Sequence, residues 1–199
     1  MVIDMNTELL SRRTLWSMAF AWQSISHAKA GFEGLQNAPI ASDSALYSTV
    51  LCGAVVSYGR PFKQQYKWAR IPERVVPREH LDTHAVLITT RDKLFAHTDA
   101  KGIIWHGYNM NEVLYRISGQ GSEMLLPHHT INAGQIPRIV ELLDILIKKF
   151  TYHVDKQHAK LFRHAIYDSG LYSLSVDDDE NILLARREDD ERPGTSLTL

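Results

Sequence analysis

The sequence predicts a mainly α-helical protein of four helices with a small subsidiary antiparallel β element. Long segments repeat apolar residues at spacings of three and four, which is the period of an amphipathic helix. Two other segments hold short β-prone runs separated by glycine, asparagine or aspartate. The 199 residues, 44% hydrophobic and 23% charged, suit one globular domain. We therefore expect a single domain, 1–199, with helices in about 7–102 and 135–167 and β segments in about 103–126 and 171–187.

The first helix is expected from about Thr7 to Gly31, with an apolar face formed by Leu15, Met18, Ala19, Trp22 and Ile25. Glycine, asparagine and proline between 31 and 39 indicate a connector. Ser42 is a candidate N-cap of the second helix, because its hydroxyl can accept a hydrogen bond from a free amide of the first turn. That helix should end at Tyr58-Gly59-Arg60-Pro61, where the glycine and the proline both favour termination.

A polar and basic segment, Phe62 to Val76, should connect the second helix to a third. Pro77 suits the first position of this third helix, which we expect from about Arg78 to His97. A long final helix is predicted from about Ile136 to Tyr167, with a core stripe of Ile139, Leu143, Leu146, Ile147, Phe150 and Val154.

The β-prone runs fall into two groups. After Gly102 a small meander is expected from Ile103–Trp105, Glu112–Ile117 and Met124–Leu126. Further along, Leu171–Val176 and Ile182–Arg186 flank an acidic turn and predict a hairpin. The charged tail, 188–199, is expected to be frayed.

Charge and cysteine content exclude several classes of protein. The formal net charge of −1 gives no global field that would attract a polyanion, so nucleic acid would need a local basic patch. Cys52 is the only cysteine, which excludes an intramolecular disulfide or a cysteine-cluster metal site. It lies in an apolar run and is expected to be a small buried hydrophobe. The N-terminal residues do not resemble a signal peptide, and no run is long and apolar enough to span a membrane, so we expect a cytoplasmic protein.

The stretch from Arg91 to His97 combines residue types that can act together on a phosphate. A guanidinium can hold a phosphate through two parallel hydrogen bonds, and an imidazole can move a proton at neutral pH. Because helical residues turn by about 100° each, Arg91 and His97 can converge only if the helix ends near Ala96. Together they suit metal-free RNA cleavage, in which the 2′-hydroxyl attacks the adjacent phosphate.

The run Leu87 to Asp99 resembles the signature of HEPN-domain proteins. These are helical bundles whose motif is an arginine, a polar residue, a few further residues and a histidine at a helix end. Arg91, Asp92 and His97 match these positions. The pairs Arg74/His80 and Arg78/His84 have the same spacing, but Val75 and Glu79 follow these arginines in place of the family's Asn, Asp or His.

The resemblance implies a HEPN-like four-helix bundle that covers about 7–102 and the final helix. It also implies a homodimer in which the motifs of two protomers meet in one cleft. The family's frequent activity is that of a metal-independent ribonuclease of toxin or antiviral-defence type. The β segments match no part of the family pattern.

Three more residues are candidates for binding substrate. His84 precedes Arg91 by two helical turns, so the two side chains share a face. Tyr58 and Arg60 could reach the same cleft if the second and third helices pack antiparallel. The basic and aromatic segment 62–74 could contact RNA, although a solvated loop is its simplest interpretation.

The leading hypothesis is a HEPN-type endoribonuclease that needs no cofactor and acts on RNA as a homodimer. Arg91 would bind the scissile phosphate, His97 would handle protons, and Asp92 would orient one of them. The alternative is a non-catalytic HEPN-like module for dimerisation or binding, with a nucleotide or a protein such as an antitoxin as its partner. Separately, Arg91 and His97 could merely cap and solvate the C-terminal end of a helix. A third hypothesis is a metalloenzyme built on His80 and His84. No third candidate ligand lies at a spacing typical of a metal site, so no metal is expected.

Overall fold

The computed structural model describes residues 5–38, 40–41, 44–63, 70–96, 114–119, 121–125, 131–162, 170–179 and 181–187. These residues form four α-helices, α1 (Met5–Asn37), α2 (Ala45–Gly59), α3 (Leu81–Thr90) and α4 (Ile136–Phe162). They also form two antiparallel hairpins, β1 (Leu114–Ser118) with β2 (Gly121–Leu125), and β3 (Leu171–Val176) with β4 (Ile182–Arg187). The prediction of a mainly helical protein with small antiparallel β elements is confirmed.

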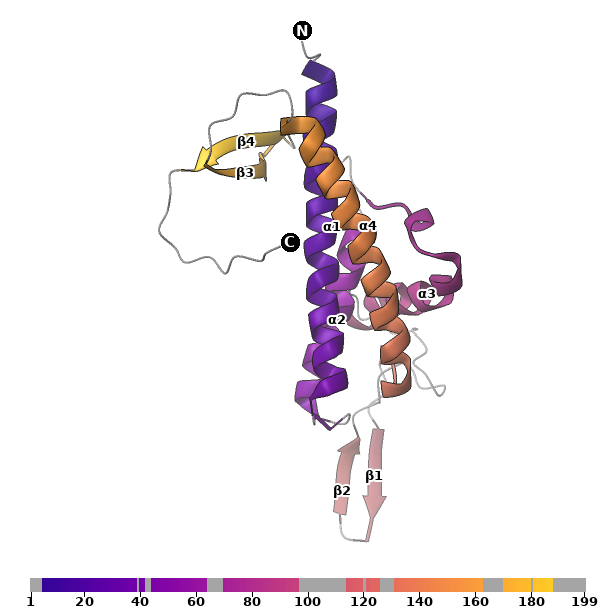
Figure 1. Ribbon diagram of the computed structural model, residues 1–199. Helices are drawn as coiled ribbons and strands as arrows, with labels where there is room; N and C mark the ends of the chain where they lie inside the picture. Colours follow the sequence, from indigo (N-terminus) through magenta and orange to yellow (C-terminus); the bar gives the residue numbers. More distant parts are fainter. Residues whose placement is uncertain are drawn as a thin grey trace.

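The long helices α1 and α4 lie side by side, and α2 packs along α1 (Figure 1). The shorter α3 lies across α2 and α4 and contacts both. The two hairpins lie at opposite ends of the helices, with β3–β4 beside α1 and β1–β2 projecting beyond the other end (Figure 1). None of the described helices combines the length and apolar character needed to cross a membrane.

Helix α1 continues through the predicted connector, so the prediction that it stops at Gly31 is wrong. A Cβ placed on Gly31 would lie 2.8 Å from the Cβ of Ala54 on α2. The glycine therefore permits close packing of two helices and does not end one. The expected apolar face is present, with Leu15 and Ile25 buried and Met18 and Trp22 packed against the core.

Helix α2 is capped by Ser44, whose hydroxyl accepts a hydrogen bond from the amide of Tyr47 at 3.1 Å. The predicted cap, Ser42, lies outside the described residues, and the observed cap is two positions later. The helix ends at Gly59 as predicted, and a 3₁₀ turn, Arg60–Phe62, follows.

The predicted third helix comprises three successive helical segments. A 3₁₀ turn, Arg78–His80, leads into α3, and a π-helical turn, Arg91–Ala96, follows it. Pro77 lies at the N-cap and not at the first helical position. The α-helical hydrogen-bond pattern therefore changes at the first residue of the HEPN-like motif, and such π-helical turns are frequent at functional sites.

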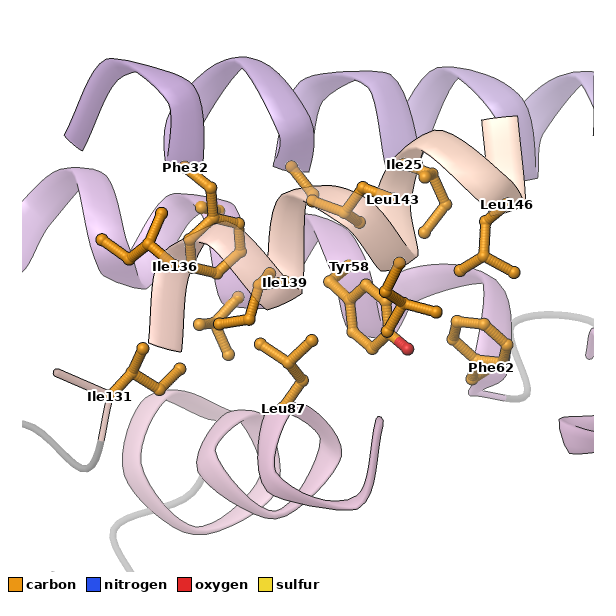
Figure 2. Close-up of a cluster of buried hydrophobic side chains, with 14 of the residues drawn as sticks. Ile25, Phe32, Tyr58, Phe62, Leu87, Ile131, Ile136, Ile139, Leu143 and Leu146 are labelled. Atoms are coloured by element: carbon orange, nitrogen blue, oxygen red, sulfur yellow. The ribbon is translucent and has the colours of Figure 1, made fainter. Parts of the chain in front are cut away.

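One face of α4 faces the core, where α1, α2 and α3 converge (Figure 2). Four residues of the predicted stripe are buried, namely Ile139, Leu143, Leu146 and Phe150. Ile147 is partly buried against the core and Val154 is half-buried. Ile136, Leu142 and Leu161 of the same helix are also buried.

The β3–β4 hairpin follows the prediction closely, with Val176 opposite Ile182 at its turn. In the other group, β1 and β2 form a hairpin with Ser118 opposite Gly121. The first run of the predicted meander, Ile103–Trp105, lies outside the described residues, as does the tail from 188.

Candidate functional site

The C-terminal end of α2 and the side of α3 that faces it hold a buried pair of polar side chains. The hydroxyl of Tyr58 and Nδ1 of His84 are 2.7 Å apart. The ring of Phe62 packs against the His84 ring, with centroids 4.7 Å apart at 72°. Both members of the pair were predicted as site residues, and the structure shows that they contact each other directly.

The protonation of this pair follows from its surroundings. Burial and the negative charge of Glu73 raise the pKa of Tyr58 far above its ordinary value. Burial lowers the pKa of His84, and Lys63 adds to this effect while Glu73 opposes it. Both groups are therefore neutral near pH 7. We assign the tyrosine as the donor, because its buried hydroxyl has no other acceptor among the described residues. With this assignment the histidine proton resides on Nε2.

Arg91 lies against the last residue of α2. A Cβ on Gly59 would be 3.0 Å from both Cγ and Cδ of Arg91, so any larger residue there would make the arginine shift by a few tenths of an ångström. Its Nε is buried and has no hydrogen-bond partner among the described residues. Consecutive residues of α2, Tyr58 and Gly59, thus position two side chains of the α3 segment, His84 and Arg91.

Asp92 joins Arg91 to a lysine from the other side of the site. Arg91 Nη1 donates to Asp92 Oδ1 at 2.9 Å, and Lys63 Nζ donates to Asp92 Oδ2. All three side chains are partly exposed. Burial works against ionisation, but the hydrogen bonds and charges of Lys63 and Arg91 outweigh it and hold the pKa of Asp92 below its ordinary value. The cluster therefore contains two cations and one carboxylate.

A cavity of about 190 Å³ opens beside this cluster. Lys63 belongs to both the cluster and the cavity wall. The remaining wall is formed by Phe62, Arg70, Ile71, Glu73, His84 and Ile88. The cavity thus combines an apolar surface with two cations, one carboxylate and the imidazole of the buried pair.

Most of the predicted site residues converge at this place. Tyr58, His84, Arg91 and Asp92 lie around the end of α2 and the end of α3. Arg60 is exposed on the 3₁₀ turn that follows α2. His97 lies outside the described residues.

Sequence reasoning placed Lys63 in a basic segment but did not assign it to the site. Its partner Asp92 is 29 positions away in the chain, so a single sequence contains no signal of their contact. Glu73 was likewise missed, because it follows proline in a segment without helical or strand periodicity.

The two histidines of the metalloenzyme hypothesis have different partners. His84 is hydrogen-bonded to Tyr58, whereas Nε2 of His80 faces Glu141 of α4 at 3.9 Å. Within the part of the chain that the structure describes, no three histidine, cysteine or acidic side chains gather closely enough to hold a metal ion.

Cys52 is half-buried on α2, so the expectation of a buried cysteine is only partly met. Burial raises the pKa of its thiol, which reduces the thiolate fraction at neutral pH.

Comparisons of the chain with protein-family models, with curated proteins and with solved structures gave no match.

Proposed function

We propose that this protein is a HEPN-type, metal-independent endoribonuclease that works as a homodimer in the cytoplasm. The observation that carries the proposal is the cluster of Arg91, Asp92 and Lys63 at the partly exposed end of α3. It holds more positive than negative charge, as a site for a phosphodiester requires. Support also comes from the motif itself, because its arginine begins a π-helical turn and lies against a glycine that gives it room.

Each residue has a defined role in this proposal. Asp92, which is ionised and bonded to Nη1, orients the guanidinium of Arg91 so that its other N–H groups can bind the scissile phosphate. Lys63 adds a second cation for the charge that develops on phosphorus. His97 removes the proton of the attacking 2′-hydroxyl or protonates the leaving 5′-oxygen. The products are a 2′,3′-cyclic phosphate and a 5′-hydroxyl end.

The first test is cleavage of a mixed RNA panel in EDTA by the wild-type protein and by the Arg91→Ala and His97→Ala variants. We expect cyclic-phosphate ends from the wild type. Each variant should lose about 10²–10⁴-fold in rate, the usual contribution of a positioned acid–base or an oxyanion donor.

Two glycines of α2 provide a matched control that leaves every polar group in place. A Cβ on Gly59 would press on the Arg91 side chain and shift it by a few tenths of an ångström, whereas a Cβ on Gly53 meets nothing within 4 Å. Gly59→Ala should therefore lower the cleavage rate, by less than the roughly 10²-fold that a misplacement of about 1 Å can cost, and Gly53→Ala should not. Equal activity of the two variants, or cleavage that survives Arg91→Ala, would contradict the assignment of Arg91.

One observation favours the non-catalytic alternative. Asp92 already pairs with both neighbouring cations inside the chain, and such a cluster also suits a structural role. A binding module of this kind would cleave no RNA in the panel but would still bind a nucleotide or a protein partner.

Sedimentation velocity of the same preparation tests the homodimer independently, and a monomer at micromolar concentration would argue against a cleft shared between two protomers.

A further inference from the structure

The cavity next to the proposed catalytic cluster has a pattern of donors and acceptors that the cleavage reaction does not use. Three side chains present N–H groups: Lys63, Arg70 and His84. One side chain, Glu73, presents a carboxylate. A ligand that fits this cavity needs hydrogen-bond acceptors for the N–H groups and hydrogen-bond donors for the carboxylate.

His84 acts as a donor in this cavity. Its Nδ1 is occupied by the Tyr58 hydroxyl at 2.7 Å, so the remaining ring nitrogen is Nε2–H. The low pKa of His84, caused by burial, keeps the imidazole neutral near pH 7. Tyr58 thus fixes the tautomer of a histidine that lines the cavity, as a hydrogen-bond partner does for many functional histidines.

Glu73 lines the same cavity as His84. The charge of its carboxylate also acts on the pKa values of both Tyr58 and His84. Its backbone is fixed on both sides. The amide of Ile71 donates to the Pro61 carbonyl at 2.7 Å, and Lys149 of α4 donates to the Val75 carbonyl at 2.9 Å.

Lys63 joins the cavity to the proposed catalytic cluster. It pairs with Asp92 through one of its three N–H groups and lines the cavity. Within the described part of the chain its other N–H groups have no partner, so they can meet a ligand there. A nucleotide whose phosphate lies at Arg91 could therefore place its base in the cavity. The side chains of Phe62, Ile71 and Ile88 would offer this base an apolar surface.

We propose that this cavity binds a guanine base of the RNA substrate, next to the cleaved phosphate. The proposal rests on the proposed function. Guanine presents two neighbouring acceptors, O6 and N7, which arginine and lysine commonly contact, and two neighbouring donors, N1–H and N2–H₂, which match both oxygens of a carboxylate. Adenine offers one amino group to a carboxylate, and uracil offers one N–H, so each leaves part of the cavity unmatched.

The test begins with binding, because binding does not require cleavage. The full-length protein is titrated at pH 7.5 with GMP, AMP, CMP and UMP by calorimetry. We expect GMP to bind at least about 10-fold more tightly than the others, which is within the usual discrimination of a matched pair of hydrogen bonds. Equal binding of the four nucleotides, or no binding of GMP, would overturn the proposal.

Glu73→Gln keeps the size of the side chain and replaces an acceptor oxygen with an amide nitrogen that donates. This variant should lose the preference for GMP, while Glu79→Gln, an exposed change outside the cavity, should keep it. Retention of the preference in Glu73→Gln would overturn the assignment of the carboxylate. Thermal unfolding of both variants checks that they fold.

Mapping of cleavage sites separates this proposal from the ribonuclease proposal. Cleavage confined to positions next to guanine in the wild type, and spread over other bases in Glu73→Gln, supports both. Cleavage without base preference overturns the guanine site and leaves the ribonuclease intact. Preferential GMP binding without any cleavage supports the guanine site and overturns the ribonuclease.

Discussion

At the scale of single residues, the pair of Tyr58 and His84 shows how a buried polar contact can organise a site. The two side chains come from different helices, α2 and α3, and His84 also lines the cavity. Their hydrogen bond satisfies both groups, and it orients His84 toward the cavity. The same contact should therefore contribute to stability as well as to ligand binding.

Tyr58→Phe tests this contribution. The change leaves Nδ1 of His84 buried without a donor, and we expect it to lower the free energy of unfolding by about 1–3 kcal/mol. Tyr47→Phe is the matched control on the same helix, because the Tyr47 hydroxyl is buried and makes no hydrogen bond within the described residues. Urea unfolding of both variants should show a loss for Tyr58→Phe only. A similar loss for both would mean that the hydrogen bond adds nothing.

The low pKa of His84 also predicts a dependence of stability on pH. Burial, with help from Lys63, disfavours the protonated imidazole in the folded protein, and Glu73 only partly offsets this. Below the unfolded pKa of about 6.5 the unfolded chain binds a proton that the folded chain does not, so this part of the stability is lost as the pH falls toward the folded pKa.

The free energy of unfolding should accordingly decrease more steeply between pH 7 and pH 5 in the wild type than in His84→Asn. Urea titrations at several pH values measure both slopes, and the difference between them isolates His84 from the other nine of the ten histidines. Parallel pH curves would contradict a depressed pKa.

At the scale of elements, two glycines of the helices allow a neighbouring group to approach closely. Gly31 lies against Ala54, and Gly59 lies against Arg91. The first contact sets the distance between α1 and α2, and the second positions the motif. Gly34, in contrast, has nothing within 4 Å of its Cβ position.

Gly31 and Gly34 offer a matched pair of substitutions on α1. Gly31→Ala places its Cβ 2.8 Å from the Ala54 Cβ, so α1 and α2 must separate, at a cost of about 1–3 kcal/mol. Gly34→Ala meets no atom and should stabilise the helix by about 0.5–1 kcal/mol. Thermal unfolding followed by circular dichroism should give shifts of opposite sign. A stabilising Gly31→Ala would show that the helices are packed less closely than described.

At the scale of the whole molecule, the apolar face of α4 joins the other three helices. Ion pairs add links at its margin, such as Lys29 to Asp144 at 3.2 Å and Arg138 to Asp82 at 3.0 Å. These pairs are exposed, so most of the stability should come from buried apolar surface.

Phe150→Ala should therefore lower the free energy of unfolding by about 3–5 kcal/mol, because the Phe150 side chain is 0% exposed in the shared core. Tyr152→Ala, two positions along the same helix and 63% exposed, should change it by less than about 0.5 kcal/mol. Guanidinium unfolding measures both values. A small effect of Phe150→Ala would argue against this core.

The fold class and most of the elements follow from local sequence. The helical period of α4, the C-terminal end of α2 and the β3–β4 hairpin were predicted, because each depends on local patterning of apolar residues and on nearby helix breakers. Arg91, Asp92, His84 and Tyr58 were also candidate site residues from the sequence.

Only the tertiary structure decided how these residues meet. The role of Gly31 depended on Ala54, the role of Lys63 depended on Asp92, and the cavity arose from segments that are distant in the sequence. The local sequence around a glycine near a helix end, or around a lysine in a polar loop, does not reveal whether another segment of the chain packs beside it. Local sequence fixes periodicity and capping, whereas close approach and charge pairing are properties of the packed chain.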